Sequence, residues 1–176
     1  MDAYAKSKTP QEGRDLRATP WPVYFAICDH LGLEPEIDVC AGHDTAKAPE
    51  YWTEADDALG RNWPALVSWM NPPYSRPGDW CEKAAMESRA GAIVIGLLPD
   101  DRSTSWYQRW VYPYASAIYT TDRRISFLDS RGMPQDGNPK GSIVPIWTPW
   151  RVDAPAGGVI QLPKKDRFER IERIAA

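Results

Sequence analysis

Apolar residues near the start of the chain recur at the spacing of a helix. Val23 and Ile27 are four residues apart, and a leucine follows four residues further on. This spacing places the side chains on one face of a helix, and the glycine that comes next commonly ends one. The pattern predicts an amphipathic helix with Thr19 as N-cap and Pro20 as its first residue, ended by Gly32.

Farther along, short apolar runs bounded by Gly, Pro or polar residues are typical of β-strands. The run 92–98 is apolar almost throughout, as in a strand buried on both faces of a parallel sheet, and Pro99 should stop it. Other strands are expected at 36–41, 51–53, 67–70, 116–120, 124–128, 142–147 and 159–162. Helices are expected from about Trp80 to Gly91, from Thr104 to Val111 after Ser103, and from Lys164 to Ala176.

The early strands alternate with helices, whereas the late strands follow one another directly. This order predicts the α/β class, with a mostly parallel sheet and a late antiparallel hairpin. At 176 residues the chain fits one domain, which we assign to 19–176. Residues 1–18 are polar and without periodicity, so we expect them to form a flexible N-terminal arm.

Composition and charge narrow the function further. Cys28, Cys40 and Cys81 form no CxxC pair and the two histidines complete no zinc pattern, so we expect neither a disulfide framework nor a metal. No apolar run approaches the roughly 20 residues of a membrane span, which predicts a soluble intracellular protein. Residues 1–70 carry six Lys and Arg against twelve Asp and Glu, whereas 71–176 carry fifteen against twelve. A polyanion should therefore bind to residues 71–176, where basic residues outnumber acidic ones.

The most unusual stretch is Asn71-Pro72-Pro73-Tyr74, which follows an expected strand and opens a shaped loop over 71–80. Two consecutive prolines fix φ and remove two donors, so the carbonyls of Asn71 and Pro72 must face the space above the strand. Tyr74 adds a flat aromatic face beside these acceptors. The four residues form a candidate catalytic loop.

Such a loop suits methyl transfer to a planar NH2 group, whose nitrogen is a poor nucleophile because its lone pair is delocalised. If the Asn71 side-chain oxygen and the Pro72 carbonyl each accept one hydrogen, the lone pair is directed at the incoming methyl group. Tyr74 would stack on the ring and hold that angle. Positioning and preorganised dipoles then supply the catalysis. Adenine N6, cytosine N4 and a glutamine amide all fit, and an ordinary proline turn is the alternative.

Two acidic residues are candidate contacts for a small ligand. Asp38 lies inside an apolar strand, where a carboxylate costs free energy unless it accepts hydrogen bonds. It either caps a neighbouring turn or accepts hydrogen bonds around a cofactor at the strand end. Asp57 could reach a ribose or an adenine amino group, unless its segment is simply a solvated acidic loop. Thr19, Pro20 and Trp21 lie at a helix mouth that can line the same pocket.

Seven short motifs then occur in a fixed order. They are Thr-Pro-Trp (19–21), Ile-Asp-Val-Cys-Ala (37–41), Asp-Asp-Ala-Leu (56–59), Asn-Pro-Pro-Tyr-Ser (71–75), Leu-Leu-Pro (97–99), Arg-Arg-Ile-Ser-Phe (123–127) and Pro-Lys-Gly-Ser (139–142). In order and spacing they resemble the phage-type DNA N6-adenine methyltransferase family, often called Dam, over most of residues 19–147.

The resemblance implies a single-domain, Rossmann-like methyltransferase fold. It also implies transfer of a methyl group from S-adenosylmethionine to N6 of adenine in double-stranded DNA, by base flipping and direct in-line transfer, with S-adenosylhomocysteine as product. A phage or prophage enzyme of this kind acts in the cytoplasm of the bacterial host cell. By position, the catalytic residues are Asn71, Pro72, Pro73 and Tyr74. The cofactor contacts are Thr19, Pro20, Trp21, Asp38, Val39, Cys40, Ala41, Asp57 and Asn71, and the DNA contacts are Ser75, Arg76, Arg123, Arg124, Phe127 and Lys140.

The sequence departs from the family pattern in two respects. The glycine-rich turn that many methyltransferases carry after the first strand is here Cys-Ala-Gly-His. No long segment separates that strand from the catalytic loop, so a separate target-recognition domain is missing there. We expect 75–79 and 121–141 to read the DNA, although the arginines of the second stretch could equally serve solubility. The remaining alternatives are an N4-cytosine or other amino-group methyltransferase and a catalytically inactive DNA-binding relative.

Overall fold

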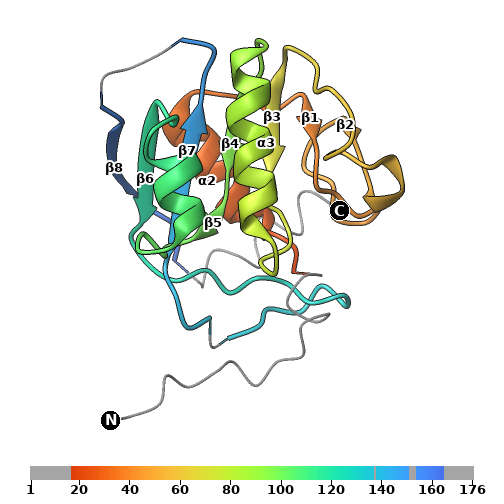
Figure 1. Cartoon of the computed structure of the whole chain (residues 1–176). Helices are drawn as coiled ribbons and strands as arrows, with labels where there is room; N and C mark the ends of the chain where they lie inside the picture. Colours follow the sequence, from red (N-terminus) through yellow and green to blue (C-terminus); the bar gives the residue numbers. More distant parts are fainter. Residues whose placement is uncertain (1–16, 137, 151–153, 165–176) are drawn as a thin grey trace.

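The computed structural model describes residues 17–136, 138–150 and 154–164, in which one mixed β-sheet carries helices on both faces (Figure 1). The strands are β1 (Ile37–Asp38), β2 (Glu50–Tyr51), β3 (Val67–Met70), β4 (Ile93–Gly96), β5 (Leu98–Pro99), β6 (Ala117–Thr121), β7 (Ser142–Trp147) and β8 (Ala156–Ile160). The helices are α2 (Trp21–Leu31), α3 (Pro77–Arg89), the 3₁₀ turn η1 (Glu54–Asp56) and the π-helical turn η2 (Tyr107–Val111).

The strands follow the order β2-β1-β3-β4-β7-β6-β8, and β5 also pairs with β7. The pairs within β2-β1-β3-β4 are parallel, as is β6 with β8. β7 runs antiparallel to β4, β5 and β6. The expected α/β class with a mostly parallel, mixed sheet is confirmed, and β6 with β7 forms the late antiparallel pair.

The two faces of the sheet build two separate cores. Successive strand residues point to opposite faces. Accordingly, Trp69 packs in the cluster that holds Val23 and Ile27 of α2, whereas its neighbour Met70 packs in the cluster that holds Ala84 of α3. Because the sheet is covered on both faces, its central strands are apolar at every position except Ser68 and Ser142, rather than alternating.

The first helix begins one residue later than expected and its N-cap is different. Pro20 is the N-cap, and its carbonyl accepts hydrogen bonds from the backbone N–H groups of Val23 and Tyr24. Thr19 does not cap the helix, because its hydroxyl accepts a hydrogen bond from Asn71 instead. Gly32 ends the helix at φ 63°, as expected.

Several strand and helix limits also differ. β3 and β7 have the expected limits, whereas the strand expected at 36–41 is a ladder of only two residues, β1. The run 92–98 is divided at Leu97 into β4 and β5, and Pro99 belongs to β5. The edge strand expected at 51–53 is β2, the one expected at 116–120 is β6, and the one expected at 159–162 is β8.

The helices contain two further corrections. α3 begins at Pro77, so the last four residues of the expected loop 71–80 form its first turn. The helix expected after Ser103 is helical from residue 105, and the Thr104 hydroxyl donates to the Asp101 carbonyl. The C-terminal helix expected at 164–176 lies almost wholly outside the described residues.

The strand expected at 124–128 is wrong. Ile125 and Phe127 are buried as an alternating strand pattern requires, yet only Leu128 forms isolated bridges, to Ala18 and to Pro134. The physical reason is the sheet order: β6, which immediately precedes this stretch, already has β7 and β8 on its two edges. No edge of β6 remains for 124–128 to pair with.

Residues 1–16 of the expected N-terminal arm lie outside the described residues. The last two, Arg17 and Ala18, are described, and Ala18 is buried and paired with Leu128. In the described part of the chain, no helix has the length and apolar character to cross a membrane.

Candidate active site

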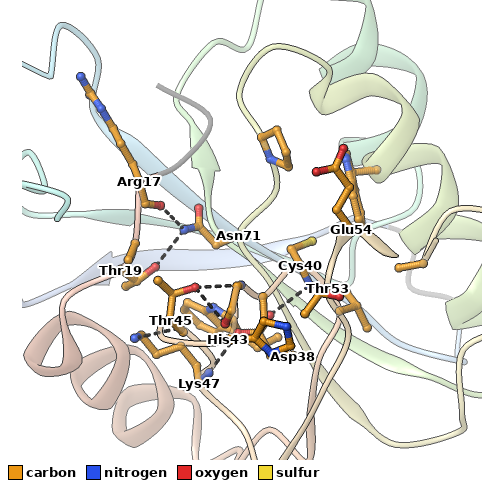
Figure 2. A pocket seen from close by; sticks show the side chains of 18 of the residues that line it. Arg17, Thr19, Asp38, Cys40, His43, Thr45, Lys47, Thr53, Glu54 and Asn71 are labelled. Atoms are coloured by element: carbon orange, nitrogen blue, oxygen red, sulfur yellow. Dashed lines mark hydrogen bonds between the residues drawn. The ribbon is translucent and has the colours of Figure 1, made fainter. Parts of the chain in front are cut away.

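A cavity of about 700 Å³ opens at the carboxyl ends of β1 and β3. The chain passes from β1 to β2 on one side and then crosses back past β1 to β3 on the other side, so the two successive connections run in opposite directions. In open α/β sheets, ligands bind in the crevice at such a switch point. Figure 2 shows the polar side chains that surround the cavity.

The structure brings most of the sequence-predicted residues to this cavity. Its wall includes Thr19, Asp38, Val39, Cys40, Ala41, Asp57, Asn71, Pro73, Ser75 and Arg76. Eight others are not part of the wall, namely Pro20, Trp21, Pro72, Tyr74, Arg123, Arg124, Phe127 and Lys140.

Asp38 shapes the loop that leaves β1. Its side chain is 3% exposed, its Oδ1 accepts the N–H of Cys40 at 3.1 Å, and its Oδ2 accepts the N–H of Lys47 at 3.0 Å. Burial raises the pKa of this carboxyl to about 6, although the two N–H groups oppose that shift. The turn-capping interpretation of Asp38 is therefore correct, and the residue also lies in the cavity wall.

The same loop is closed a second time by Thr45. The Gly42 N–H donates to Thr45 Oγ1 at 2.8 Å, and the Thr45 N–H donates to the Gly42 carbonyl at 3.1 Å. These contacts and those of Asp38 use side-chain oxygens to satisfy backbone donors in the turn. The turn after β1 is therefore closed with one glycine, Gly42, and without a glycine-rich sequence.

Lys47 is a cavity residue that the sequence analysis missed. Its side chain is buried, its Nζ donates to the Thr45 carbonyl at 3.1 Å, and Nζ lies 4.1 Å from the centre of the Trp21 ring. Trp21 thus lies behind Lys47 rather than in the wall itself. No motif identified Lys47, because its burial depends on the contact with a helix 26 residues earlier in the chain.

The side chain of Asn71 is oriented by the segment before α2 (Figure 2). Its Nδ2 donates to Thr19 Oγ1 at 3.1 Å and to the Arg17 carbonyl at 3.3 Å. A backbone carbonyl can only accept, so the atom facing Arg17 must be the amide nitrogen. The amide oxygen consequently points away from these two partners.

Tyr74 packs into the core on the α2 side of the sheet. Its ring meets Phe127 edge to face, with 5.9 Å between ring centres and 84° between ring planes. Its hydroxyl is buried and has no hydrogen-bond partner among the described residues, and burial raises its pKa. Phe127 is 2% exposed and therefore supports Tyr74 rather than facing the surface.

The acidic segment around η1 supplies two carboxylates to the cavity wall, Glu54 and Asp57. Asp56 is used differently, because its Oδ2 accepts hydrogen bonds from both the N–H and the hydroxyl of Thr53. Asp57 ends η1 in the left-handed region at φ 48° and is exposed. Glu54 and Asp57 are thus the two acidic residues of this segment whose carboxylates line the cavity, and Asp57 as a ligand contact stays a prediction.

The connection 122–141 lies at the same end of the sheet as the cavity (Figure 1). β6 is parallel to β4 by way of β7, so the segment that leaves β6 must begin there. Ser130 of this connection is part of the cavity wall, as are Ser75 and Arg76 of the loop after β3. Arg76 forms an ion pair with Asp79.

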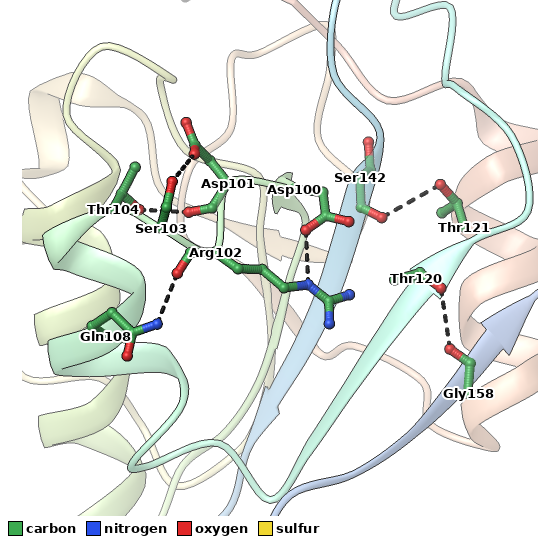
Figure 3. A network of polar contacts seen from close by, with 10 residues as sticks. All are labelled: Asp100, Asp101, Arg102, Ser103, Thr104, Gln108, Thr120, Thr121, Ser142 and Gly158. Carbon is green, nitrogen blue, oxygen red and sulfur yellow. Dashed lines mark hydrogen bonds and ion pairs between the residues drawn. The ribbon is translucent and has the colours of Figure 1, made fainter.

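The predicted basic residues of this connection differ in their surroundings. Arg123 forms an ion pair with Asp122 at 2.6 Å, whereas Arg124 is exposed. Lys140 forms an ion pair with Asp101. Asp101 belongs to a polar network that also joins Arg102 to Asp100 (Figure 3). In the described ranges, no group of three His, Cys, Asp or Glu side chains could hold a metal ion.

Most of the chain is similar in sequence to known proteins of one family. The model of a family described as DNA N-6-adenine-methyltransferase (Dam) matches residues 6–171. A DNA N-6-adenine-methyltransferase of Haemophilus phage HP1 (strain HP1c1) is 31% identical over 146 residues, which are 82% of this chain and 84% of the relative. A protein of the same name from Escherichia phage T1 is 28% identical over 157 residues, 80% of this chain and 66% of the relative. No solved structure matches the chain.

Proposed function

Because this chain belongs to the DNA N-6-adenine-methyltransferase (Dam) family, we propose that it transfers a methyl group from S-adenosylmethionine to N6 of adenine in double-stranded DNA. The observation that carries this proposal is the position of Asn71. Its amide is held by its nitrogen at the carboxyl end of β3, in the wall of the cavity, which leaves the oxygen to accept a hydrogen bond.

We assign residues 19–176 to a single Rossmann-like methyltransferase domain. Two features support this assignment: helices on both faces of the sheet, and a cavity at the switch point between β1 and β3. The insertion of the antiparallel β7 between β4 and β6 is the departure from an all-parallel sheet.

The cavity fits the methyl donor in size and in polar groups. Its volume of about 700 Å³ is within the range of small-molecule sites. S-adenosylmethionine supplies a methyl group on a positively charged sulfur, together with ribose hydroxyls, an adenine and a carboxylate. Asp57 would accept hydrogen bonds from the ribose or the adenine amino group, and the buried ammonium of Lys47 would suit the carboxylate. Asp38 would act mainly by holding the loop 39–47 that lines the site.

The target amino group would be held by two acceptors. Asn71 Oδ1 and the Pro72 carbonyl would each accept a hydrogen bond from one of its hydrogens, which directs the nitrogen lone pair at the methyl group for an in-line transfer. The carbon–sulfur bond breaks as the carbon–nitrogen bond forms, S-adenosylhomocysteine leaves as a neutral thioether, and the methylated nitrogen then loses one proton to water. Both acceptors are fixed before the substrate arrives, Asn71 by its hydrogen bonds and Pro72 by its ring. Preorganised dipoles of this kind need no rearrangement during the reaction.

The adenine must leave the DNA stack to reach the cavity, which costs a few kcal/mol. Stacking on Tyr74 would return about 1 to 3 kcal/mol. For this, the Tyr74 ring must turn from Phe127 toward the cavity. In its packed position the Tyr74 hydroxyl makes no hydrogen bond to a described residue. Turning the ring therefore breaks no hydrogen bond to these residues.

DNA would approach over the loop after β3 and the connection 122–141. Ser75 and Arg76 are exposed beside the cavity, and Arg123 and Arg124 are exposed on the connection. Lys140 would contact DNA only by exchanging its ion pair with Asp101 for a phosphate. Phe127 would contribute indirectly, as the support of Tyr74.

The experiment that tests the proposal combines the protein with duplex DNA and isotope-labelled S-adenosylmethionine. Mass spectrometry of the digested nucleosides should find the label on N6 of deoxyadenosine, and the Asn71→Ala variant should give none. Label on N4 of deoxycytidine would replace the proposed substrate. Absence of label, with no S-adenosylhomocysteine binding in calorimetry, would identify an inactive DNA-binding relative.

A further inference from the structure

The orientation of the Asn71 amide depends on residues outside the catalytic loop. Two hydrogen bonds from Nδ2 fix it, one to Thr19 Oγ1 and one to the Arg17 carbonyl. If both bonds were lost, the amide would be free to turn, and its NH2 group could face the target amino group. Two donors would then oppose each other, so the identity of the atom facing the target decides whether the amide can assist.

The segment 17–19 is itself held at its middle and at its last residue. Its middle residue, Ala18, exchanges two backbone hydrogen bonds with Leu128, at 3.0 and 2.9 Å. Its last residue, Thr19, is 2% exposed and precedes Pro20, the N-cap of α2. The hydroxyl that orients Asn71 is therefore presented by a backbone with little freedom.

Leu128 connects this segment to the loop 128–135. It bridges Pro134 as well as Ala18, and the Asp129 carboxylate accepts the N–H groups of Arg131 at 2.9 Å and Met133 at 3.0 Å. Ser130, at the start of this loop, lies in the cavity wall. A short series of hydrogen bonds thus runs from a loop at the DNA-facing end of the sheet to the catalytic amide.

We propose that Thr19 is a positioning residue that keeps the Asn71 amide oxygen toward the target adenine, and that the pairing of Ala18 with Leu128 links this orientation to the loop 128–135. The proposal rests on the proposed function for the meaning of the amide, but the orientation can be measured without any reaction. It gives Thr19 a different task from the cofactor contact implied by the family resemblance.

The first test compares Thr19→Val, which removes the acceptor at nearly constant shape, with Thr19→Ser, which keeps it. The side-chain NH2 resonances of Asn71 are assigned in ¹⁵N-labelled protein by their loss in Asn71→Asp. We expect them to shift in Thr19→Val and to stay in place in Thr19→Ser. We expect kcat to fall roughly 3- to 10-fold in Thr19→Val, as for one lost hydrogen bond, while the Kd of S-adenosylhomocysteine changes less than twofold.

Unmoved Asn71 resonances in a folded Thr19→Val variant would overturn the proposal. So would a weaker affinity for S-adenosylhomocysteine at unchanged kcat, because Thr19 would then be a cofactor contact. If Thr19→Val fails to fold, an Asn71 shift in Thr19→Ser relative to Thr19→Ala decides the question instead. Failure of the wild type to methylate DNA would contradict the proposed function and leave the NMR result standing.

The link to the loop is tested with a matched pair of variants. Asp129→Ala removes the acceptor of two loop N–H groups, whereas Arg131→Ala removes only the exposed partner of the same carboxylate. The Asn71 resonances should move in Asp129→Ala and remain in Arg131→Ala. Resonances that stay in place in both variants would show that the loop and the amide are independent.

Discussion

The carboxylate of Asp57 occupies the space that a side chain at Gly60 would fill. An ideal Cβ atom on Gly60 would lie 2.2 Å from Asp57 Oδ2, far closer than atoms without a bond can approach. The backbones of the two residues also form a hydrogen bond, in which the Gly60 N–H donates to the Asp57 carbonyl at 3.0 Å. The glycine thus leaves room for the carboxylate at its position beside the cavity.

Gly60→Ala should therefore weaken cofactor binding without touching the cofactor. The added methyl group displaces the Asp57 carboxylate, and one hydrogen bond to a charged group is worth about 1.5 to 3 kcal/mol. Calorimetry with S-adenosylhomocysteine should show about tenfold or greater weakening in Gly60→Ala and in Asp57→Ala. The double variant should be no weaker than Asp57→Ala, and Gly158→Ala, whose Cβ makes only ordinary contacts, should bind normally. Additive effects would mean that Gly60 acts independently of Asp57.

Asn71→Ala should abolish methyl transfer and leave the Kd of S-adenosylhomocysteine nearly unchanged, because the amide acts on the base. Asn71→Asp keeps an acceptor oxygen and should retain some activity. That activity should remain below the wild-type level, because its second oxygen would face the Arg17 carbonyl, which can only accept. Single-turnover assays measure both variants, and equal rates for wild type and Asn71→Ala would contradict the mechanism.

Tyr74→Phe should stabilise the protein. The buried hydroxyl has no partner among the described residues, and an unsatisfied buried hydroxyl costs about 1 to 3 kcal/mol. Urea unfolding should therefore give a higher free energy of unfolding for Tyr74→Phe, by about 1 kcal/mol. Methylation should persist because the ring can still stack, whereas Tyr74→Ala should lose it. Tyr112→Phe, at an exposed position, is the control, and a destabilised Tyr74→Phe would indicate a hydrogen bond to the hydroxyl.

Asp38 should make stability depend on pH in the acidic range. Burial raises its pKa in the folded protein from the ordinary value of 3.8 to about 6, so the folded state holds the proton more tightly than the unfolded state. Its contribution is complete below about pH 4 and is lost as pH rises through about 6, in total about 3 kcal/mol. The free energy of unfolding of wild type minus that of Asp38→Asn should fall over this range. A constant difference would show that the pKa is not raised.

The arginines of the connection 122–141 can be tested by salt dependence. If Arg123 and Arg124 bind phosphates, replacing both with Ala should weaken all duplexes alike and flatten the salt dependence by roughly one unit per lost contact. If one reads a base edge, the preference between two duplex sequences should relax instead. Fluorescence titrations at several salt concentrations distinguish these results. Arg89→Ala, at the end of α3, is the control. If neither the salt dependence nor the sequence preference changes, Arg123 and Arg124 do not contact DNA.

The sequence predicted those elements whose limits are set by residues close together in the chain. The limits of β3 and β7 follow from short apolar runs between polar or proline-containing stretches, and Gly32 ends α2 because few other residues adopt its φ of 63°. The loop at Asn71 was recognisable because consecutive prolines restrict the backbone strongly.

The contacts that orient the site depend on residues far apart in the sequence. Thr19 and Asn71 are 52 residues apart, so nothing near Thr19 indicated that its hydroxyl would orient an amide rather than cap a helix. Lys47 was missed for a similar reason, since the Trp21 ring buries it. The segment 124–128 has a strand pattern but no free edge of β6 to join, which only the order of the whole sheet reveals.

The place of β7 in the sheet has a consequence for synthesis of the protein. β7 is the seventh strand to be made, yet it separates β4 from β6, pairing Ile95 and Ala117 with the same residue, Ile146. Until residues 142–147 leave the ribosome, β4 has an open apolar edge, and such edges invite pairing with other chains. The two halves of the sheet can join only when most of the chain exists. A fragment that stops before residue 142 should therefore aggregate rather than fold as a smaller version of the enzyme.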